Sequence, residues 1–155
     1  MVILRCQPVD LIAFLSAPTV RLKLTVRPKL YAHLLIQVTA GEARAVYAVS
    51  DPSAPIAIAG LFAWPDRESE AWFMVDTARA AHCLPACLAA IRRALRQEAP
   101  SHSRGILARV EPGNRAGETI AKVLGFESTG DGIWRFAGCR TSSAICSEEA
   151  LRKSC

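Results

Sequence analysis

The pattern of apolar and polar positions predicts short strands and helices in the first part of the chain. A strand is expected over residues 2–6, and Pro8-Val9-Asp10 opens a short helix. Residues 21–26 alternate as a strand does, and Pro28 can occupy the first turn of a helix that reaches Gln37. The apolar sides of the two helices consist of Leu11, Phe14 and Leu15 in the first and of Leu30, Leu34 and Val38 in the second.

Three further strands are predicted in the middle of the chain. Residues 43–50 and 55–64 are apolar runs joined by Asp51-Pro52-Ser53-Ala54, which is a turn sequence, so they are expected to form an antiparallel hairpin. A second turn over residues 65–69 leads into a strand over residues 71–76.

The pattern then changes to a helix over residues 85–97, with Pro85 in its first turn. Residues 105–111 follow as a strand. The buried face of the helix is expected at Leu84, Leu88, Ile91 and Leu95.

The segment from Asn114 to Phe126 carries the clearest local signals. Asn114 can cap a helix by accepting hydrogen bonds from its free amides, and Gly125 stands where helices commonly end in a left-handed residue. A hairpin is expected after this stop. The apolar face of the helix is predicted at Ile120, Val123 and Leu124.

This order of elements favours an α+β protein over a doubly wound fold. With 155 residues, of which 51% are hydrophobic, the chain is long enough for one domain with a core. We predict that this domain spans residues 1–137. Residues 138–155, rich in Cys, Ser and charge, are predicted to be an extension that packs through Ile145 and Leu151 on a partner or on its own domain.

The composition indicates which classes of partner are not expected for this chain. Lys and Arg outnumber Asp and Glu by 19 to 14, and a cluster is seen only at Arg92, Arg93 and Arg96, without interleaved aromatic residues, so a nucleic-acid binder is not expected. No apolar run approaches the length of a membrane span, so a cytoplasmic protein that does not bind membranes is expected. Among the six cysteines only Cys83 and Cys87 are close, beside His82, and a second ligand pair is missing, so no metal site is predicted.

The segment from Asn114 to Phe126 resembles the corresponding segment of the GCN5-related N-acetyltransferases (GNAT). Their C-terminal half carries an Asn, a small residue three positions on, and a Gly-Phe pair before the final hairpin, and Asn114, Gly125 and Phe126 fall at the matching spacing. The resemblance implies a mixed, mostly antiparallel sheet flanked by helices, over residues 2–137. It also implies acetyl-CoA as the cofactor of an active member.

In that family, backbone amides after the fourth strand cradle the CoA pyrophosphate, and a glycine-rich loop allows the close approach. Aligned from Val75, the loop here has Arg79 in place but His82 and Leu84 at the glycine positions. A tyrosine often protonates the leaving thiolate seven residues after the Asn, and Ala121 stands there instead.

The resemblance implies a set of candidate site residues, and each of them has a functional and a structural interpretation. Glu70, ahead of Glu68 and Asp76, is the candidate catalytic base, and Asn114 is carried over as a catalytic and cofactor-binding residue. Val75, Arg79 and His82 are the other candidate cofactor-binding residues, with Arg79 and His82 able to hold phosphate by side chain. Alternatively, the carboxylates are solvated strand-end groups and Asn114 is only a helix cap.

The leading functional hypothesis is an acetyltransferase fold without efficient acetyl transfer. Residues 71–77 and 114–126 are similar to a phage-encoded branch with a loop that lacks the glycine signature. This likeness implies a structural or interaction protein with protein or particle partners, in an oligomer or assembly, in the cytoplasm or in a virion. The alternative is an active N-acetyltransferase that uses acetyl-CoA through an atypical loop.

Overall fold

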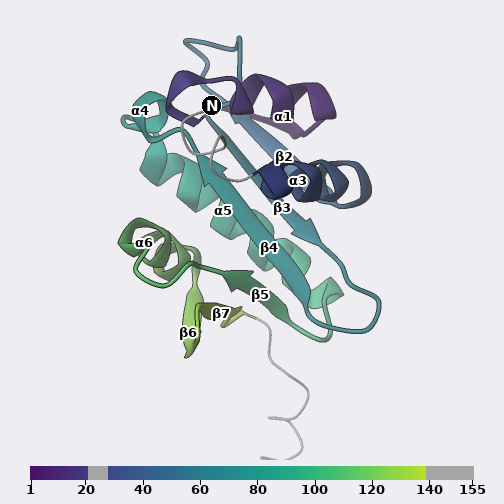
Figure 1. The fold of residues 1–155 in the computed structure, drawn as a ribbon. Coiled ribbons are helices and arrows are strands. Elements are labelled where there is room, and N and C mark those ends of the chain that lie inside the picture. The colour runs from purple at the N-terminus through teal and green to yellow at the C-terminus, as the bar shows by residue number, and fades with distance from the viewer. Residues whose placement is uncertain (21–27, 139–155) are drawn as a thin grey trace, which may run out of the picture. The chain divides into compact units, whose positions relative to one another are not determined.

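The structure, a computed structural model, describes residues 1–20 and 28–138, and within them the chain is an α+β protein with a mixed seven-stranded sheet. The strand order is β1-β2-β3-β4-β5-β7-β6 (Figure 1). The strands are Val2–Arg5 (β1), Glu42–Tyr47 (β2), Ala57–Phe62 (β3), Ser69–Val75 (β4), Ile106–Arg109 (β5), Phe126–Gly130 (β6) and Ile133–Phe136 (β7). The helices are Pro8–Leu15 (α1), Pro28–Ala40 (α3), Thr77–Ala80 (α4), Leu84–Glu98 (α5) and Arg115–Leu124 (α6), with a short 3-10 turn at Ala99–Ser101.

The predicted elements are confirmed with small shifts in their ends. The expected hairpin is present, since β2 and β3 pair antiparallel with Ala45 opposite Ile58. Strand β4 is a neighbour of β5, as the family resemblance requires. The predicted strand over residues 21–26 and the extension over residues 139–155 lie outside the described residues.

The chain divides into two compact units. The first comprises residues 1–62 and 71–91, and the second comprises residues 63–70 and the chain from Arg92 onward. In the first unit, α1 and α3 cover one face of the strands, and the first turns of α5 lie on the other (Figure 1).

In the first unit, successive residues of a strand point alternately to the two faces of the sheet, so the same strands contribute apolar side chains to both core clusters. Ala45, Ile58 and Trp72 belong to the cluster beneath α1 and α3, whereas their neighbours Ala57 and Phe73 belong to the cluster on the other face. The Trp72 ring lies so close to Gly60 that a Cβ there would come within 2.6 Å of it. A strand buried on both faces therefore carries glycine where the indole crosses it.

Asp10 anchors α1 to the sheet. One of its carboxylate oxygens accepts a hydrogen bond from the Gln7 amide at 2.7 Å, and the other accepts one from the Tyr47 hydroxyl at 2.7 Å. Burial, and then this hydrogen bond to Asp10, raises the pKa of Tyr47. Tyr47 is therefore a neutral phenol that holds the helix to strand β2.

The second unit places α6 beside the β5, β7 and β6 strands. The Asn114 side chain accepts a hydrogen bond from the Gly117 amide at 3.1 Å, and Gly125 ends the helix at a φ of 98°, as predicted. Strands β6 and β7 form the expected hairpin, with Phe126 opposite Phe136.

The predicted apolar face of α6 was wrong at one position. Val123 is 44% exposed, whereas Ala121 and Leu124 are buried. Residues three apart on a helix share a face, and the position just before Leu124 is turned by about 100° away from it. The inward face of α6 therefore includes alanine, which a search for large apolar residues passes over.

Candidate functional site

The segment after β4 consists of the short helix α4, a turn over residues 81–83 and the start of α5, and the expected phosphate loop over residues 79–84 spans all three. Asp76 is 1% exposed and caps α4, where its Oδ1 accepts hydrogen bonds from the amides of Ala78 at 3.2 Å and Arg79 at 3.3 Å. Its Oδ2 is also buried and has no hydrogen-bond partner among the described residues. The amides that follow this strand thus point at a carboxylate of their own chain.

Arg79 is held in the same unit by the turn between β2 and β3. Its guanidinium donates to the Asp51 carboxylate at 2.7 Å and to the carbonyls of Ala54 at 3.1 Å and Pro55 at 3.2 Å. The side chain is 26% exposed. Three of the guanidinium's possible bonds are therefore made within the protein, and the geometry indicates a structural clamp.

Val75 and His82 occupy the two ends of this segment. Val75 is the last residue of β4 and packs in the core cluster with Cys87 and Ala80. His82 is exposed in the turn that leads to α5. Within the described part of this segment, Arg79 and Asp76 make side-chain hydrogen bonds, and Asp76 was considered at the sequence level only as a possible base.

Glu70 lies on β4 in the second unit. Its side chain is 19% exposed, and its Oε1 is 3.8 Å from Nε of Arg109. The neighbouring Glu68 is bound by Arg135 through two hydrogen bonds, at 2.7 and 3.1 Å. A catalytic base and a carboxylate in a structural ion pair would both have this geometry. The role of Glu70 as a base therefore stays a prediction.

Ser69 stands between these two carboxylates and is 5% exposed. Its Oγ lies 2.7 Å from Nδ1 of His102, and its amide donates to the Gly105 carbonyl at 3.0 Å. This serine–histidine pair was not predicted, because its members are 33 residues apart and no local pattern links them. The buried hydroxyl joins β4 to the turn that precedes β5.

Asn114 is exposed, and its Oδ1 is used by the α6 cap. Gly117 makes this cap sterically available, since a Cβ at that position would lie 2.7 Å from Nδ2 of Asn114. The small residue three positions after the Asn is thus explained by packing. Nothing in this geometry requires a ligand.

The free cysteines of the described residues are Cys6, Cys83 and Cys87. Burial raises the pKa of Cys6 to about 12 and that of Cys87 to about 11, so both thiols are protonated at neutral pH. Within residues 1–20 and 28–138, no group of three His, Cys, Asp or Glu side chains is arranged to hold a metal ion. In the same residues, no helix has the length and apolar character needed to cross a membrane.

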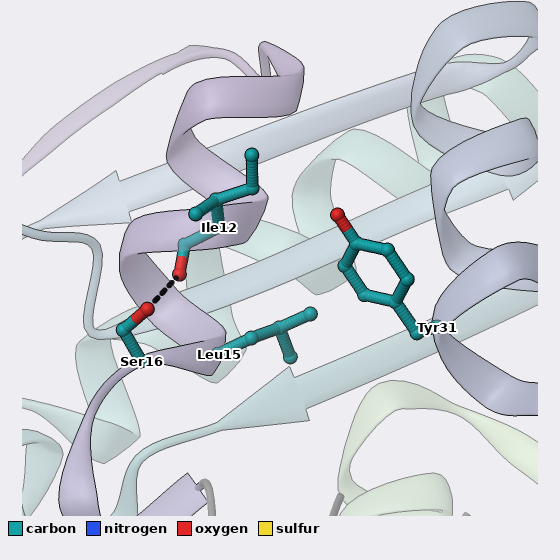
Figure 2. Close-up of a pocket in the computed structure, with 4 residues that line it drawn as sticks. All are labelled: Ile12, Leu15, Ser16 and Tyr31. Atoms are coloured by element: carbon teal, nitrogen blue, oxygen red, sulfur yellow. Dashed lines mark hydrogen bonds between the residues drawn. The ribbon is translucent and has the colours of Figure 1, made fainter. Parts of the chain in front are cut away.

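A shallow hollow of about 350 Å³ lies between α1 and α3 (Figure 2). It is lined by Ile12, Leu15, Ser16 and Tyr31, and the Ser16 hydroxyl is used in a hydrogen bond to the Ile12 carbonyl at 2.8 Å. Tyr31 extends from α3 into the space beside α1 (Figure 2). None of these four residues is charged, so none of them would recognise an amine or a phosphate by an ion pair.

Comparison with known proteins was informative only at the level of structure. No family model and no curated protein sequence matches the chain. Among solved structures, the ribosomal-protein-S5-alanine acetyltransferase of Vibrio fischeri matches with a TM-score of 0.58 and 13% identity, over 83% of this chain and 80% of that chain. A mutant spermidine N-acetyltransferase from Vibrio cholerae matches with a TM-score of 0.57 and 13% identity, over 87% and 92%. A GNAT-family acetyltransferase from Listeria monocytogenes matches with a TM-score of 0.55 and 15% identity, over 87% and 92%.

The protein therefore has the fold of the GNAT acetyltransferases. At these identities the likeness establishes the fold alone, because one fold supports many functions.

Acetyl-CoA, the cofactor that the fold family implies, does not fit the residues present after β4. A pyrophosphate cradle needs free backbone amides and room for close approach. Here the positions that glycine occupies in the family carry the side chains of His82 and Leu84, and Pro85 has no amide to offer. The two amides just before or at the start of this loop, those of Ala78 and Arg79, are already bonded to Asp76.

Proposed function

We propose that this chain is a GNAT-fold interaction protein that does not transfer acetyl groups efficiently. The observation that carries the proposal is the segment after β4, in which His82 and Leu84 fill the glycine positions and the Arg79 guanidinium is bonded to Asp51, Ala54 and Pro55. The absence of a proton donor at the position of the family's tyrosine supports it, since Ala121 is buried in the α6 face. Membership of a phage particle, and partners within such a particle, remain predictions from the sequence resemblance.

The competing function is N-acetyl transfer through an atypical CoA loop. The fold similarity favours it, and Glu70 supplies a half-buried carboxylate on the strand that leads to the loop. This function requires CoA to bind although His82 and Leu84 fill the glycine positions of the loop.

Titration calorimetry of the full chain with acetyl-CoA separates the two functions. We expect no binding at concentrations up to about 1 mM, which corresponds to a free energy weaker than roughly −4 kcal/mol. A dissociation constant in the micromolar range, together with release of free CoA thiol when amines are added, would overturn the proposal. If binding is found, replacing Arg79 by alanine tests whether this guanidinium holds the phosphate.

A rebuilt loop provides a positive control. The triple substitution Asp76→Ala, His82→Gly and Leu84→Gly removes the capping carboxylate and restores the glycine positions. We expect this variant to gain affinity for CoA relative to the unmodified chain. A matched control with Asp76→Asn retains a capping oxygen and the two side chains, so it should gain little.

A further inference from the structure

Strand β1 is an edge of the sheet with an apolar, exposed surface. All four residues of Val2–Arg5 are exposed, and the exposed fractions are 46% for Val2, 44% for Ile3 and 53% for Leu4. Strand β2 covers one side of β1, and no described strand pairs with the other side. Unpaired backbone beside exposed apolar side chains is the usual template for pairing with another chain.

The strand at the other end of the order, β6, carries the protection that β1 lacks. It has the sequence FESTG, four of its five residues are exposed and polar or glycine, and its register with β7 shifts between Ser128 and Gly130. Such irregularities and charges prevent edge pairing. By contrast, β1 runs in regular register from Val2 opposite Tyr47 to Arg5 opposite Arg44, without proline, lysine or bulge.

The hydrogen-bond pattern shows which groups of β1 are free. The Cys6 amide donates to the Ala43 carbonyl at 2.9 Å, so Cys6 faces β2 with its backbone. In an antiparallel pair this direction alternates, so Leu4 and Val2 also face β2. The amides and carbonyls of Ile3 and Arg5 consequently point away from the sheet.

From this array we infer that β1 pairs with β1 of a second copy of this chain, antiparallel about a two-fold axis at Leu4. Ile3 then lies opposite Arg5 of the second copy, and each such pair exchanges two hydrogen bonds, which gives four across the interface. The two Leu4 side chains, the most exposed of the strand, meet at the axis as a non-hydrogen-bonded pair with close Cβ atoms. Every free backbone group of β1 thus finds a partner in an identical strand.

The charges of β1 are compatible with a second copy as the occupant, and the small buried area sets the strength of the dimer. In this register each Arg5 lies opposite an isoleucine, so no like charges face each other directly, and the arginine stem covers an apolar side chain. Four residues from each copy bury far less than the roughly 1,200 Å² of a stable interface, so the dimer is a weak one that forms at high concentration or in an assembly. The inference stands whether or not the chain binds acetyl-CoA.

Sedimentation equilibrium of the full chain over a concentration series tests the interface. We expect a reversible monomer–dimer equilibrium. Ile3→Pro removes only an outward amide, so the intrachain ladder is kept and two of the four intermolecular bonds are lost. Leu4→Lys places two ammonium groups face to face at the axis, and both variants should weaken dimerisation at least about tenfold.

Val49→Lys is the matched control, because it adds the same charge at a residue that is 70% exposed and outside β1. It should leave the equilibrium unchanged. Leu4→Cys should form a disulfide between two copies under mild oxidation, identified by mass spectrometry of the linked peptides. A chain that stays monomeric up to about 1 mM, or a dimer that Ile3→Pro and Leu4→Lys weaken no more than Val49→Lys does, would overturn the inference.

Discussion

Asp76 and Arg79 stand three residues apart and close the same segment by different means. The carboxylate caps the helix that it begins, and the guanidinium reaches across to the turn between β2 and β3. Asp51, the acceptor in that turn, also accepts from the amide and hydroxyl of Ser53. These bonds, the Ser53 hydroxyl first and then Arg79, lower the pKa of Asp51 from 3.8 to about 2.

The lowered pKa predicts how acid affects the fold. The contribution of Asp51 to stability is present above its unfolded pKa of 3.8 and is lost as the pH falls through its folded value of about 2. Ser53→Ala and Arg79→Ala should each raise the Asp51 pKa, because each removes a hydrogen bond that favours the carboxylate. NMR titration of the Asp51 carboxyl measures the pKa in both variants, and a pKa that neither substitution raises would contradict the assignment.

Asn114 offers a second test of a single side chain. Replacing it by alanine removes the acceptor for the Gly117 amide, so the free energy of unfolding should fall by about 1 kcal/mol. Asn114→Asp keeps an oxygen at the cap and should stay within a few tenths of a kcal/mol of the unmodified chain. Urea unfolding measures both, and equal losses in the two variants would show that the cap is not what Asn114 supplies.

At the scale of elements, the sequence predicted what local chemistry determines. Asn114 and Gly125 mark the ends of α6 because capping and the left-handed stop act within a few residues. Helix α4 was missed because its four residues follow a strand directly, although Asp76 before Thr77 is itself a capping signal. The family alignment concerned the residues that follow, from Arg79 to Leu84, so it offered no prediction for the start of this helix.

The contact between β3 and β4 gives a prediction for two neighbouring elements. Gly60→Ala would bring a Cβ to 2.6 Å from the Trp72 indole, so the ring must move, and we expect a loss of about 1–3 kcal/mol in the free energy of unfolding. Combined with Trp72→Leu, the same glycine substitution should be much less harmful. Denaturant unfolding of the two single variants and the double variant gives the coupling, and additive losses would exclude the steric explanation.

For the whole molecule, the fold could be predicted from the sequence and the state of the site could not. Hydrophobic periodicity and the Asn114 to Phe126 motif were sufficient for the strands of the described sheet and for every longer helix, and only the short helix α4 was missed among the described α-helices. Whether Arg79 was available for a ligand depended on Asp51, which is 28 residues away, and Glu70 likewise meets Arg109 only through folding. Such long-range pairs carry no periodic or spacing signal in one sequence.

The predicted boundary at residue 137 can be tested directly. Strand β7 ends at Phe136, and the Ala137 amide still bonds the Gly125 carbonyl at 3.1 Å. Truncation after Ala137 should therefore leave the thermal midpoint nearly unchanged while it weakens assembly with partners. A truncated chain that assembles normally would contradict the interaction role predicted for the extension.

Each of the two units contains a tryptophan whose fluorescence can report the unfolding of that unit. Trp72 buries its indole nitrogen in the first unit, and Trp134 is 5% exposed in the second, beneath Lys122 at 5.9 Å. With Trp64 replaced by phenylalanine, fluorescence from variants that keep only Trp72 or only Trp134 reports each unit alone. Coincident melting curves would show that the units unfold as one cooperative body, and separated curves would show that one can open while the other stays folded.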